Sequence, residues 1–171
     1  MKFQPALLTS LVLATLSGAA LAQTVRIGNQ GDALSMDPHS LSETTQLSVT
    51  GNVYEPLAAR DRNLQLVPGL ATSWKQTSPN IWRFELRKGV KFHDGTPFTA
   101  DDVVFSFARG SGDGSDMKTY TNDIQAVRKV DSHTVEFETK TPFPILPDVF
   151  SFFYIMSKDW SEKNGAAKPV D

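Results

Sequence analysis

The sequence has no cysteine, and this absence excludes disulfide bonds, thiol catalysis and a lipid-bearing cysteine after a leader segment. It also has little excess of charge, because 17 basic residues face 19 acidic ones for a net charge of −2. A chain so nearly balanced gives no indication of a nucleic-acid or anionic-membrane partner. Without disulfides, the folded protein depends on its core alone.

Only one long apolar run occurs, ALLTSLVLATLSGAAL from Ala6 to Leu21, and it follows the basic residue Lys2. The run is shorter than the roughly 20 apolar residues of a membrane-spanning helix, and Thr, Ser and Gly interrupt it. With the small residues around Leu21, it predicts a secretory signal peptide over residues 1–22, cleaved after Ala22. Cleavage would leave 149 residues with a net charge of −3, in the bacterial periplasm.

Apolar periodicity predicts an α+β fold, built mostly on an antiparallel sheet with a few helices. In IWRFELR (81–87) large apolar residues alternate with Arg and Glu, which is typical of a strand with one buried and one charged face. Residues 30–42 are rich in Gly, Asp, Ser and Pro and are predicted to be a loop, with a helix after it. The other predicted strands are Thr24–Asn29, Ala71–Gln76, Ile124–Val130 and Thr134–Thr139, the last two as a hairpin.

A second helix is predicted to begin after Thr99, which is a good N-cap residue. Asp102 stands at the third helical position, where an acid completes a variant of the capping box. Asp101 and Asp102 both lie in the first turn, where the helix dipole favours negative charge. Arg109 falls in the last turn, and Gly110 is the expected stop. A last helix is predicted over Lys158–Asn164.

The stretch FHDGTPFTADDVVFSFAR gathers His93, Asp94, Asp101 and Asp102, which raises the question of a metal or acid/base site. Because His93 and Asp94 are adjacent, they would point to opposite faces of a strand and could not converge on one ion. Asp101 and Asp102 are accounted for as helix caps, and Asp94-Gly95-Thr96-Pro97 is typical of a turn. The charges of this stretch are therefore interpreted as scaffold.

Other chemical motifs are absent from the sequence. The histidines at 39, 93 and 133 fall on separate predicted loops, and we expect solvent-exposed turn residues and not a ligand set. GSGDGSD (110–116) lacks the Gly-Lys-Ser/Thr of a phosphate loop, and there is no Gly-x-Ser-x-Gly elbow. We expect no catalytic residues, no metal site and no cofactor. Residues at core-facing periods, expected in the core, are Trp74, Trp82, Phe84, Phe92, Phe105 and Phe107.

LVPGLATSW (66–74) followed by WRFELRKGVKFHDGTPFTADDVVFSF (82–107) resembles the signature of the bacterial extracellular solute-binding proteins of family 5. These are the periplasmic peptide, oligopeptide and nickel-type receptors of ABC importers. The resemblance runs in order over nearly all of Thr24–Asn164, from a GD-x-LSMDPH loop to a P-x-PILP segment. It is carried by many features in sequence, so it is a specific signal.

The resemblance implies a two-lobed, type II-like periplasmic binding protein that captures peptides or similar small solutes and delivers them to membrane permease subunits. Such a receptor does no chemistry and is expected to be a monomer. Residues 23–50 would begin lobe I and carry a ligand-lining loop, and residues 51–171 would form a lobe I subdomain. A second lobe is not expected within this length.

The resemblance also implies candidate ligand-binding residues. In the family, the segment after Asp-Pro-His helps to line the cleft, which here points to Leu41, Ser42, Glu43 and Thr44. The loop before it adds Asp32, Leu34, Ser35 and Met36. A tyrosine downstream of the helix reaches the pocket of peptide-binding members, and Tyr120 is the nearest candidate for it here. Backbone amides and small hydroxyls there would suit a peptide backbone. Two alternatives stay open: the loop is an ordinary exposed connection, or Glu43 is a first-turn acid of the following helix.

Family members are much longer than this chain, so we expect the N-terminal part of a receptor, with weak or absent binding by this part alone. Three other functions remain to be weighed. The chain could be a non-functional exported fragment, a nickel- or haem-type receptor of the same family, or a secreted hydrolase. No nucleophile–base–acid arrangement in the sequence supports the hydrolase.

Overall fold

The computed structural model describes Arg26, Gly28 and residues 31–169. The predicted signal peptide and most of the predicted strand Thr24–Asn29 lie outside the described residues. The chain divides into two compact units, Met1–Gln30 and Gly31–Asp171, and the helices and strands of the described part all belong to the second. None of the helices in the described part is long and apolar enough to cross a membrane.

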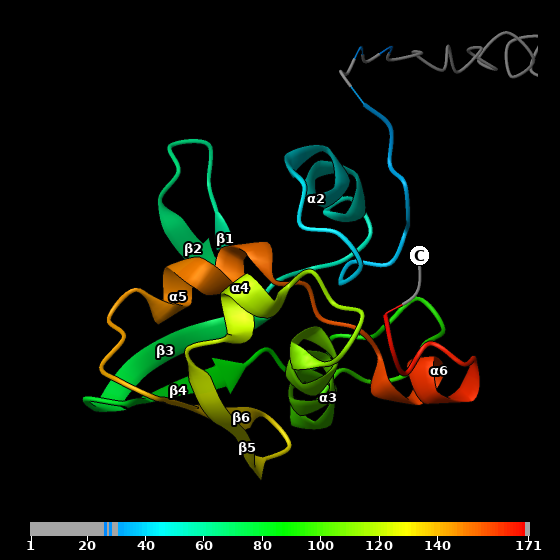
Figure 1. The fold of residues 1–171 in the computed structure, drawn as a ribbon. Coiled ribbons are helices and arrows are strands. Elements are labelled where there is room, and N and C mark those ends of the chain that lie inside the picture. The colour runs from blue at the N-terminus through cyan, green and yellow to red at the C-terminus, as the bar shows by residue number, and fades with distance from the viewer. Residues whose placement is uncertain (1–25, 27, 29–30, 170–171) are drawn as a thin grey trace, which may run out of the picture. The chain divides into compact units, whose positions relative to one another are not determined.

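Two antiparallel sheets organise the second unit (Figure 1). The larger has the order β3-β4-β6-β5, formed by β3 (Ala71–Ser78), β4 (Ile81–Leu86), β5 (Ile124–Asp131) and β6 (Thr134–Thr139). The smaller is the hairpin of β1 (Ala58–Arg60) and β2 (Leu66–Pro68). The helical segments are α2 (Thr44–Thr50), α3 (Ala100–Ser111), α4 (Lys118–Thr121), α5 (Leu146–Val149), η1 (Phe150–Phe152) and α6 (Lys158–Lys163). The α+β class predicted from the sequence is confirmed.

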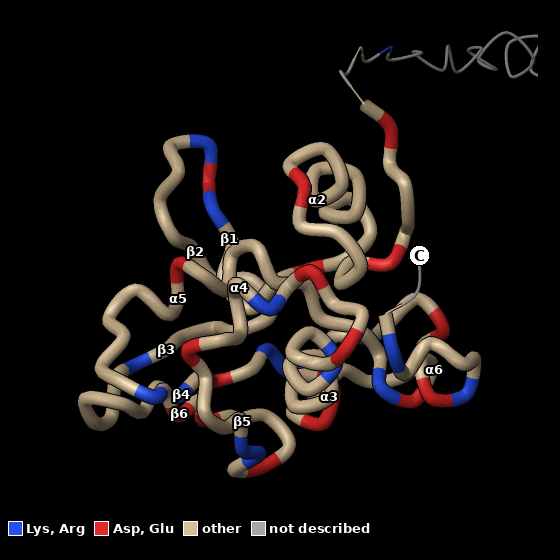
Figure 2. Tube along the Cα trace, viewed as in Figure 1, with Lys and Arg blue, Asp and Glu red and all other residues tan. Residues whose placement is uncertain are grey.

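The larger sheet buries one face and leaves the other charged, as the alternation in β4 predicts. On the inner face Phe84 is fully buried and faces Val135 of β6 in register. On the outer face Arg83 lies opposite Glu136, and their side chains form an ion pair at 2.6 Å. Charges of both signs are interspersed from Arg60 onwards, whereas residues 31–59 carry acidic residues and no Lys or Arg (Figure 2).

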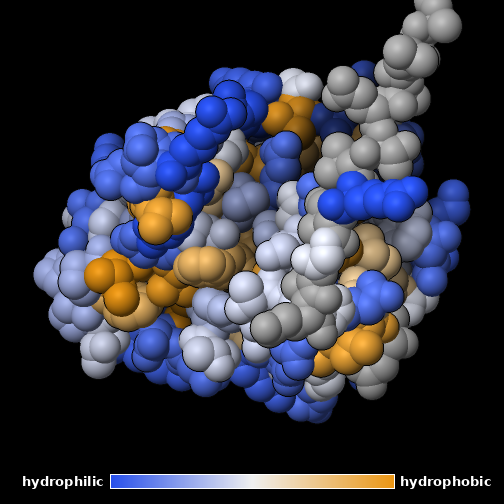
Figure 3. Space-filling model, turned by 90° about the horizontal axis from the view of Figure 1, so that it is seen from above, coloured by the Kyte–Doolittle hydropathy of each residue, from blue (hydrophilic) through white to orange (hydrophobic). Residues whose placement is uncertain are grey.

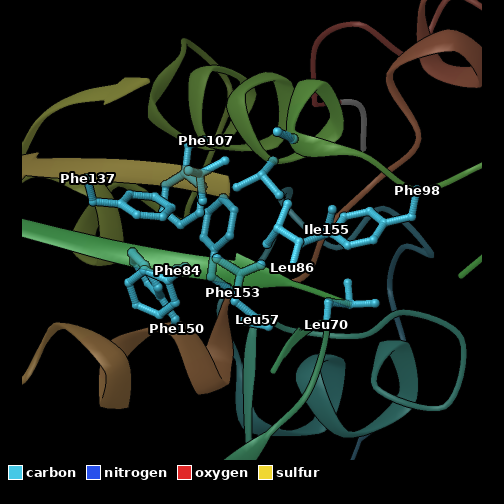
Figure 4. Packing of buried hydrophobic residues seen from close by; sticks show 14 of the residues in the cluster. Leu57, Leu70, Phe84, Leu86, Phe98, Phe107, Phe137, Phe150, Phe153 and Ile155 are labelled. Carbon is cyan, nitrogen blue, oxygen red and sulfur yellow. The ribbon is translucent and has the colours of Figure 1, made fainter. Parts of the chain in front are cut away.

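The core is a cluster of phenylalanines contributed by the sheet, by α3 and by the segment after α5 (Figure 4). The ring of Phe137 lies 4.5 Å from that of Phe150 and 4.8 Å from that of Phe107, measured between centroids. Phe84 joins them at 5.2 Å from Phe150. Edge-to-face and tilted contacts at such distances are the arrangements that aromatic pairs favour. Covering the inner face in this way brings α3 against β5 and β6.

The capping box predicted at Thr99 is present. The Thr99 hydroxyl accepts a hydrogen bond from the Asp101 amide, and the Asp102 carboxylate accepts one from the Thr99 amide at 2.8 Å. The same carboxylate accepts a bond from the Lys158 amide at 2.9 Å, so Asp102 joins the beginnings of α3 and α6. Partial burial raises the pKa of Asp102 above its usual range.

The prediction that α3 ends at Gly110 is wrong. The helix includes Gly110 and continues to Ser111, with Gly112 as its C-cap. A Cβ atom added at Gly110 would lie 2.5 Å from two ring carbons of Phe153. Gly110 is therefore needed for the close approach of helix and core, a reason that no local helix signal can show.

Internal hydrogen bonds hold the acidic turn at residues 93–97. Asp94 accepts hydrogen bonds from the Thr96 amide at 2.9 Å and from the Thr96 hydroxyl at 2.6 Å, and these bonds lower the pKa of Asp94. Gly95 takes a positive φ of 86°, which favours glycine. His93 lies in this turn and not at a strand end. Asp101 pairs with Lys129 at 2.6 Å.

Replacement of Gly110 by alanine tests the importance of this close packing. Helix propensity alone would make Gly110→Ala stabilising by about 1 kcal/mol. Because of the contact with Phe153, we expect a net loss of roughly 1–3 kcal/mol in the free energy of unfolding, measured by urea denaturation. Ser111→Ala, one residue on and exposed, should stay within about 0.5 kcal/mol of the unsubstituted chain. A Gly110→Ala variant at least as stable as the original chain would contradict the packing role of Gly110.

Candidate functional site

The loop that the sequence marks for ligand binding lies on the surface. Leu34 is 75% exposed and Met36 is 49% exposed, which is high for large apolar side chains. Asp32, Ser42, Glu43 and Thr44 are also exposed, and Ser35, Leu41 and Tyr120 are partly buried. Figure 3, which views the molecule from above Figure 1, shows that exposed hydrophobic groups on that face lie in separate patches among polar ones.

The loop is fastened to α2 through Gln46. This side chain is almost fully buried. Its amide oxygen accepts a hydrogen bond from the Ser35 amide at 3.4 Å, and its amide nitrogen donates one to the Ser35 carbonyl. Glu43 is the N-cap residue of α2 but forms no side-chain cap bond. The first turn of α2 holds no acid, so the alternative that Glu43 is a first-turn acid is wrong.

Beneath the loop lies a buried ion pair between Asp37 and Arg109 of α3. The Arg109 side chain is 0% exposed and that of Asp37 6%. Arg109 Nη1 donates to Asp37 Oδ1 at 2.8 Å, and Nη2 donates to Oδ2. The sequence places Arg109 only as a basic residue in the last turn of a helix. Its partner is 72 residues away, so no local pattern could show the pair.

His39 contradicts the expectation that all three histidines are exposed. It is fully buried, and its ring stacks on Phe153 at a centroid distance of 4.7 Å. Its Nε2 lies 2.9 Å from the Tyr154 carbonyl oxygen. Because a carbonyl only accepts hydrogen bonds, Nε2 carries the proton. The Gly- and Ser-rich surroundings of His39 in the sequence indicate a surface loop, yet the ring fills a space above the core.

Burial lowers the pKa of His39 to about 4, with the nearby Arg109 guanidinium acting in the same direction. The bond to the Tyr154 carbonyl and the charge of Asp37 oppose this shift but do not cancel it. The imidazole is therefore neutral at pH 7.

The His39 backbone links the loop to the helix that carries Tyr120. Its carbonyl accepts hydrogen bonds from the Asp116 amide and from the Ser115 hydroxyl, both at 3.1 Å. The chain then enters α4, where the ring of Tyr120 lies 6.1 Å from that of Phe152. The structure thus places Tyr120 on the helix that directly follows a segment hydrogen-bonded to the candidate loop, although its own ring contact is with Phe152.

A separate hollow of about 580 Å³ contains none of the nine predicted residues. Its lining is largely apolar and includes Val53, Tyr54, Val90, Phe92, Ile155 and Trp160. Within residues 31–169 no three His, Asp or Glu side chains gather in a way that could hold a metal ion.

Residues 65–170 match the family model described as bacterial extracellular solute-binding proteins, family 5 middle. This match covers more than half of the chain. The chain belongs to this family. The members of this family are solute-binding proteins.

Relatives and solved structures agree with this assignment. The chain is 30% identical over 150 residues to the periplasmic oligopeptide-binding protein OppA of Escherichia coli strain K12, covering 75% of this chain and 27% of that protein. OppA of Burkholderia pseudomallei superposes with a TM-score of 0.74 at 26% identity, covering 78% of this chain and 30% of that one. NikZ from Campylobacter jejuni, solved with Ni(L-His), has a TM-score of 0.73 at 27% identity, covering 81% and 28%. The chain spans less than a third of the length of these proteins.

The buried neutral histidine predicts a loss of stability in acid. The folded-state pKa of His39 lies below the ordinary 6.5, so the unfolded chain binds the proton first. The contribution of the neutral His39 to the free energy of unfolding is complete above pH 6.5 and is lost as the pH falls towards 4. Between pH 7 and pH 5 this amounts to roughly 2 kcal/mol in the free energy of unfolding.

Urea denaturation at both pH values measures this loss. His39→Gln, whose amide can still donate to the Tyr154 carbonyl, should remove most of the difference, while His93→Gln at an exposed turn should retain it. Equal losses in the His39→Gln variant and the unsubstituted chain would show that His39 does not control the effect.

Proposed function

We propose that this chain forms part of an exported periplasmic receptor that captures peptides or similar small solutes and delivers them to the permease subunits of an ABC importer. Family membership supports this proposal, as do the names of the relatives, which are periplasmic oligopeptide- and murein-peptide-binding proteins and a dipeptide-binding protein. Export through a signal peptide cleaved after Ala22 is part of the same proposal.

The candidate loop is the observation that carries the proposal. It presents exposed side chains at Asp32, Leu34 and Met36, and it is held from below by the Gln46 amide and the Asp37 carboxylate. A surface fixed before the ligand arrives loses less conformational entropy on binding than a loose one. We propose that it contacts the ligand together with Ser35, Leu41, Ser42, Glu43, Thr44 and Tyr120.

The proposed mechanism involves no chemical step. Solute binding would shift an equilibrium between open and closed forms of the receptor, and the permease would recognise the closed form. The opposite wall of the cleft would come from a part of the receptor that the described residues do not contain. Binding to this chain alone is therefore expected in the millimolar range, where only one wall of the site contributes.

A nickel complex is the second candidate ligand, because a solved structure of similar fold holds Ni(L-His). The two candidates differ in what the loop must recognise. A peptide offers backbone donors and acceptors along an extended chain, whereas a nickel–histidine complex is compact. The same experiment can therefore compare them.

Chemical-shift mapping of the ¹⁵N-labelled chain is the direct test, because it detects millimolar binding. With di- and tripeptides we expect shifts at the amides of residues 32–44 and around Tyr120, and none on the outer face of β4 and β6. Shifts produced only by Ni(L-His) would favour the nickel alternative. Peptide-induced shifts that gather on Tyr54, Phe92 and Trp160 would place the ligand in the separate hollow and contradict the proposed site.

Two exposed leucines provide a matched pair for this test. Leu34 lies in the candidate loop and Leu64, 71% exposed, lies at the tip of the β1–β2 hairpin. Leu34→Ser should weaken peptide binding by about tenfold, since roughly 1.4 kcal/mol of apolar contact is lost. Leu64→Ser should leave the affinity unchanged. Equal affinities for the two variants would contradict a role of the loop in binding.

A further inference from the structure

Arg109 joins three segments that are far apart in the sequence. Besides the two bonds to Asp37, its Nε donates to the Ala166 carbonyl at 3.0 Å and its Nη2 donates to the Lys168 carbonyl at 2.9 Å. The residue is 4% exposed, so these bonds are made away from bulk water. A charge buried this deeply is tolerated only when it is hydrogen-bonded, and here each of the three guanidinium nitrogens donates to the carboxylate or to a backbone carbonyl.

We propose that Arg109 is a positioning residue for ligand capture: its buried pair with Asp37 holds the candidate loop and α4 in one fixed arrangement. This inference rests on the proposed function, because it concerns the same surface. Arg109 lies beneath that surface and acts through Asp37.

Asp37 connects Arg109 to the loop. Asp37 Oδ1, which accepts from Arg109, also accepts a hydrogen bond from the His39 amide at 2.9 Å. The Asp37 carbonyl accepts from the Ser40 hydroxyl at 3.1 Å, and the Asp37 amide donates to the Ser35 hydroxyl at 3.0 Å. The Asp37 carboxylate therefore bonds both Arg109 and the backbone of the turn 37–40, while the Asp37 backbone bonds Ser35 and Ser40.

The His39 carbonyl connects this turn to α4. Once the turn is fixed, this carbonyl points at the Asp116 amide and the Ser115 hydroxyl, and it accepts a bond from each. Ser115 also accepts a bond from the Met117 amide at 3.0 Å, immediately before α4. The loop at residues 32–44 and the helix of Tyr120 thus share one buried support.

Lysine could not replace arginine in this arrangement. The guanidinium spreads its donors in a planar fork, which here reaches Asp37 on one side and the carbonyls of Ala166 and Lys168 on the other. An ammonium is a compact group and cannot span these acceptors together. Arg109→Lys keeps the positive charge beside Asp37 but loses the fork, which makes it the informative variant.

The experiment compares Arg109→Lys with Arg83→Lys, which alters an ion pair on the outer face of the sheet, away from the loop. Amide hydrogen exchange is followed by NMR, and peptide affinity is measured by the same shift mapping. In Arg109→Lys the amides of His39, Ser40 and Asp116 should exchange at least about tenfold faster relative to those of Phe84 and Phe137. Peptide affinity should fall by about tenfold as the competent fraction of the loop falls. Arg83→Lys should change neither quantity.

The inference would be overturned if the folded Arg109→Lys variant showed the same acceleration of exchange at loop and sheet amides, because Arg109 would then contribute only to general stability. It would also be overturned if the exchange rates of both groups of amides stayed unchanged. If the variant does not fold, exchange in the unsubstituted chain under mild denaturant decides. The amides of His39, Ser40 and Asp116 should then open with one common free energy, and independent openings would overturn the inference. Faster loop exchange without any peptide binding by the unsubstituted chain would refute the proposed function and leave the support of the loop standing.

Discussion

The structure depends on covering one face of a four-stranded sheet. The outer face of β4 and β6 carries the partly exposed ion pair of Arg83 and Glu136, while the inner face carries the buried apolar side chains Phe84 and Phe137. Phenylalanines from α3 and from the chain after α5 complete that layer, and Phe84 and Phe137 are fully buried by it. Close contact between the helix and this layer explains why a glycine stands inside α3.

Beside this apolar layer lies a polar centre made of Asp37, His39 and Arg109. Such a centre is weak evidence for stability, because the cost of removing charges from water offsets much of their attraction. It does limit the alternatives, since the bonds of Arg109 to Asp37 and of His39 Nε2 to the Tyr154 carbonyl form in only one arrangement of the chain. The residues just before and after it, at 32–36 and 41–44, are largely accessible. A buried, hydrogen-bonded support thus lies directly under an accessible surface.

The acidic residues that raise the question of a metal or acid/base site in the sequence form structural hydrogen bonds and ion pairs. Asp94 closes a turn, Asp101 pairs with Lys129, and Asp102 caps one helix while it bonds the start of another. Asp94 and His93 both line the largely apolar hollow, but within the described residues no three His, Asp or Glu side chains gather to hold a metal ion. The features that carry the family resemblance, such as the turn at Gly95 and the capping box at Thr99, are thus largely parts of the scaffold.

The sequence by itself determined what depends on near neighbours: the alternation of β4, the β5–β6 hairpin, the capping box at Thr99 and the turn at Asp94. Their signals are periodicity, turn residues and caps, all of which act over a few residues. Only the tertiary structure decided that His39 is buried, that Gly110 continues a helix and that Arg109 bonds Asp37. His39 bonds the Tyr154 carbonyl, Gly110 packs against Phe153, and Arg109 bonds Asp37, which is 72 residues away. Such long-range contacts leave no local pattern in the sequence.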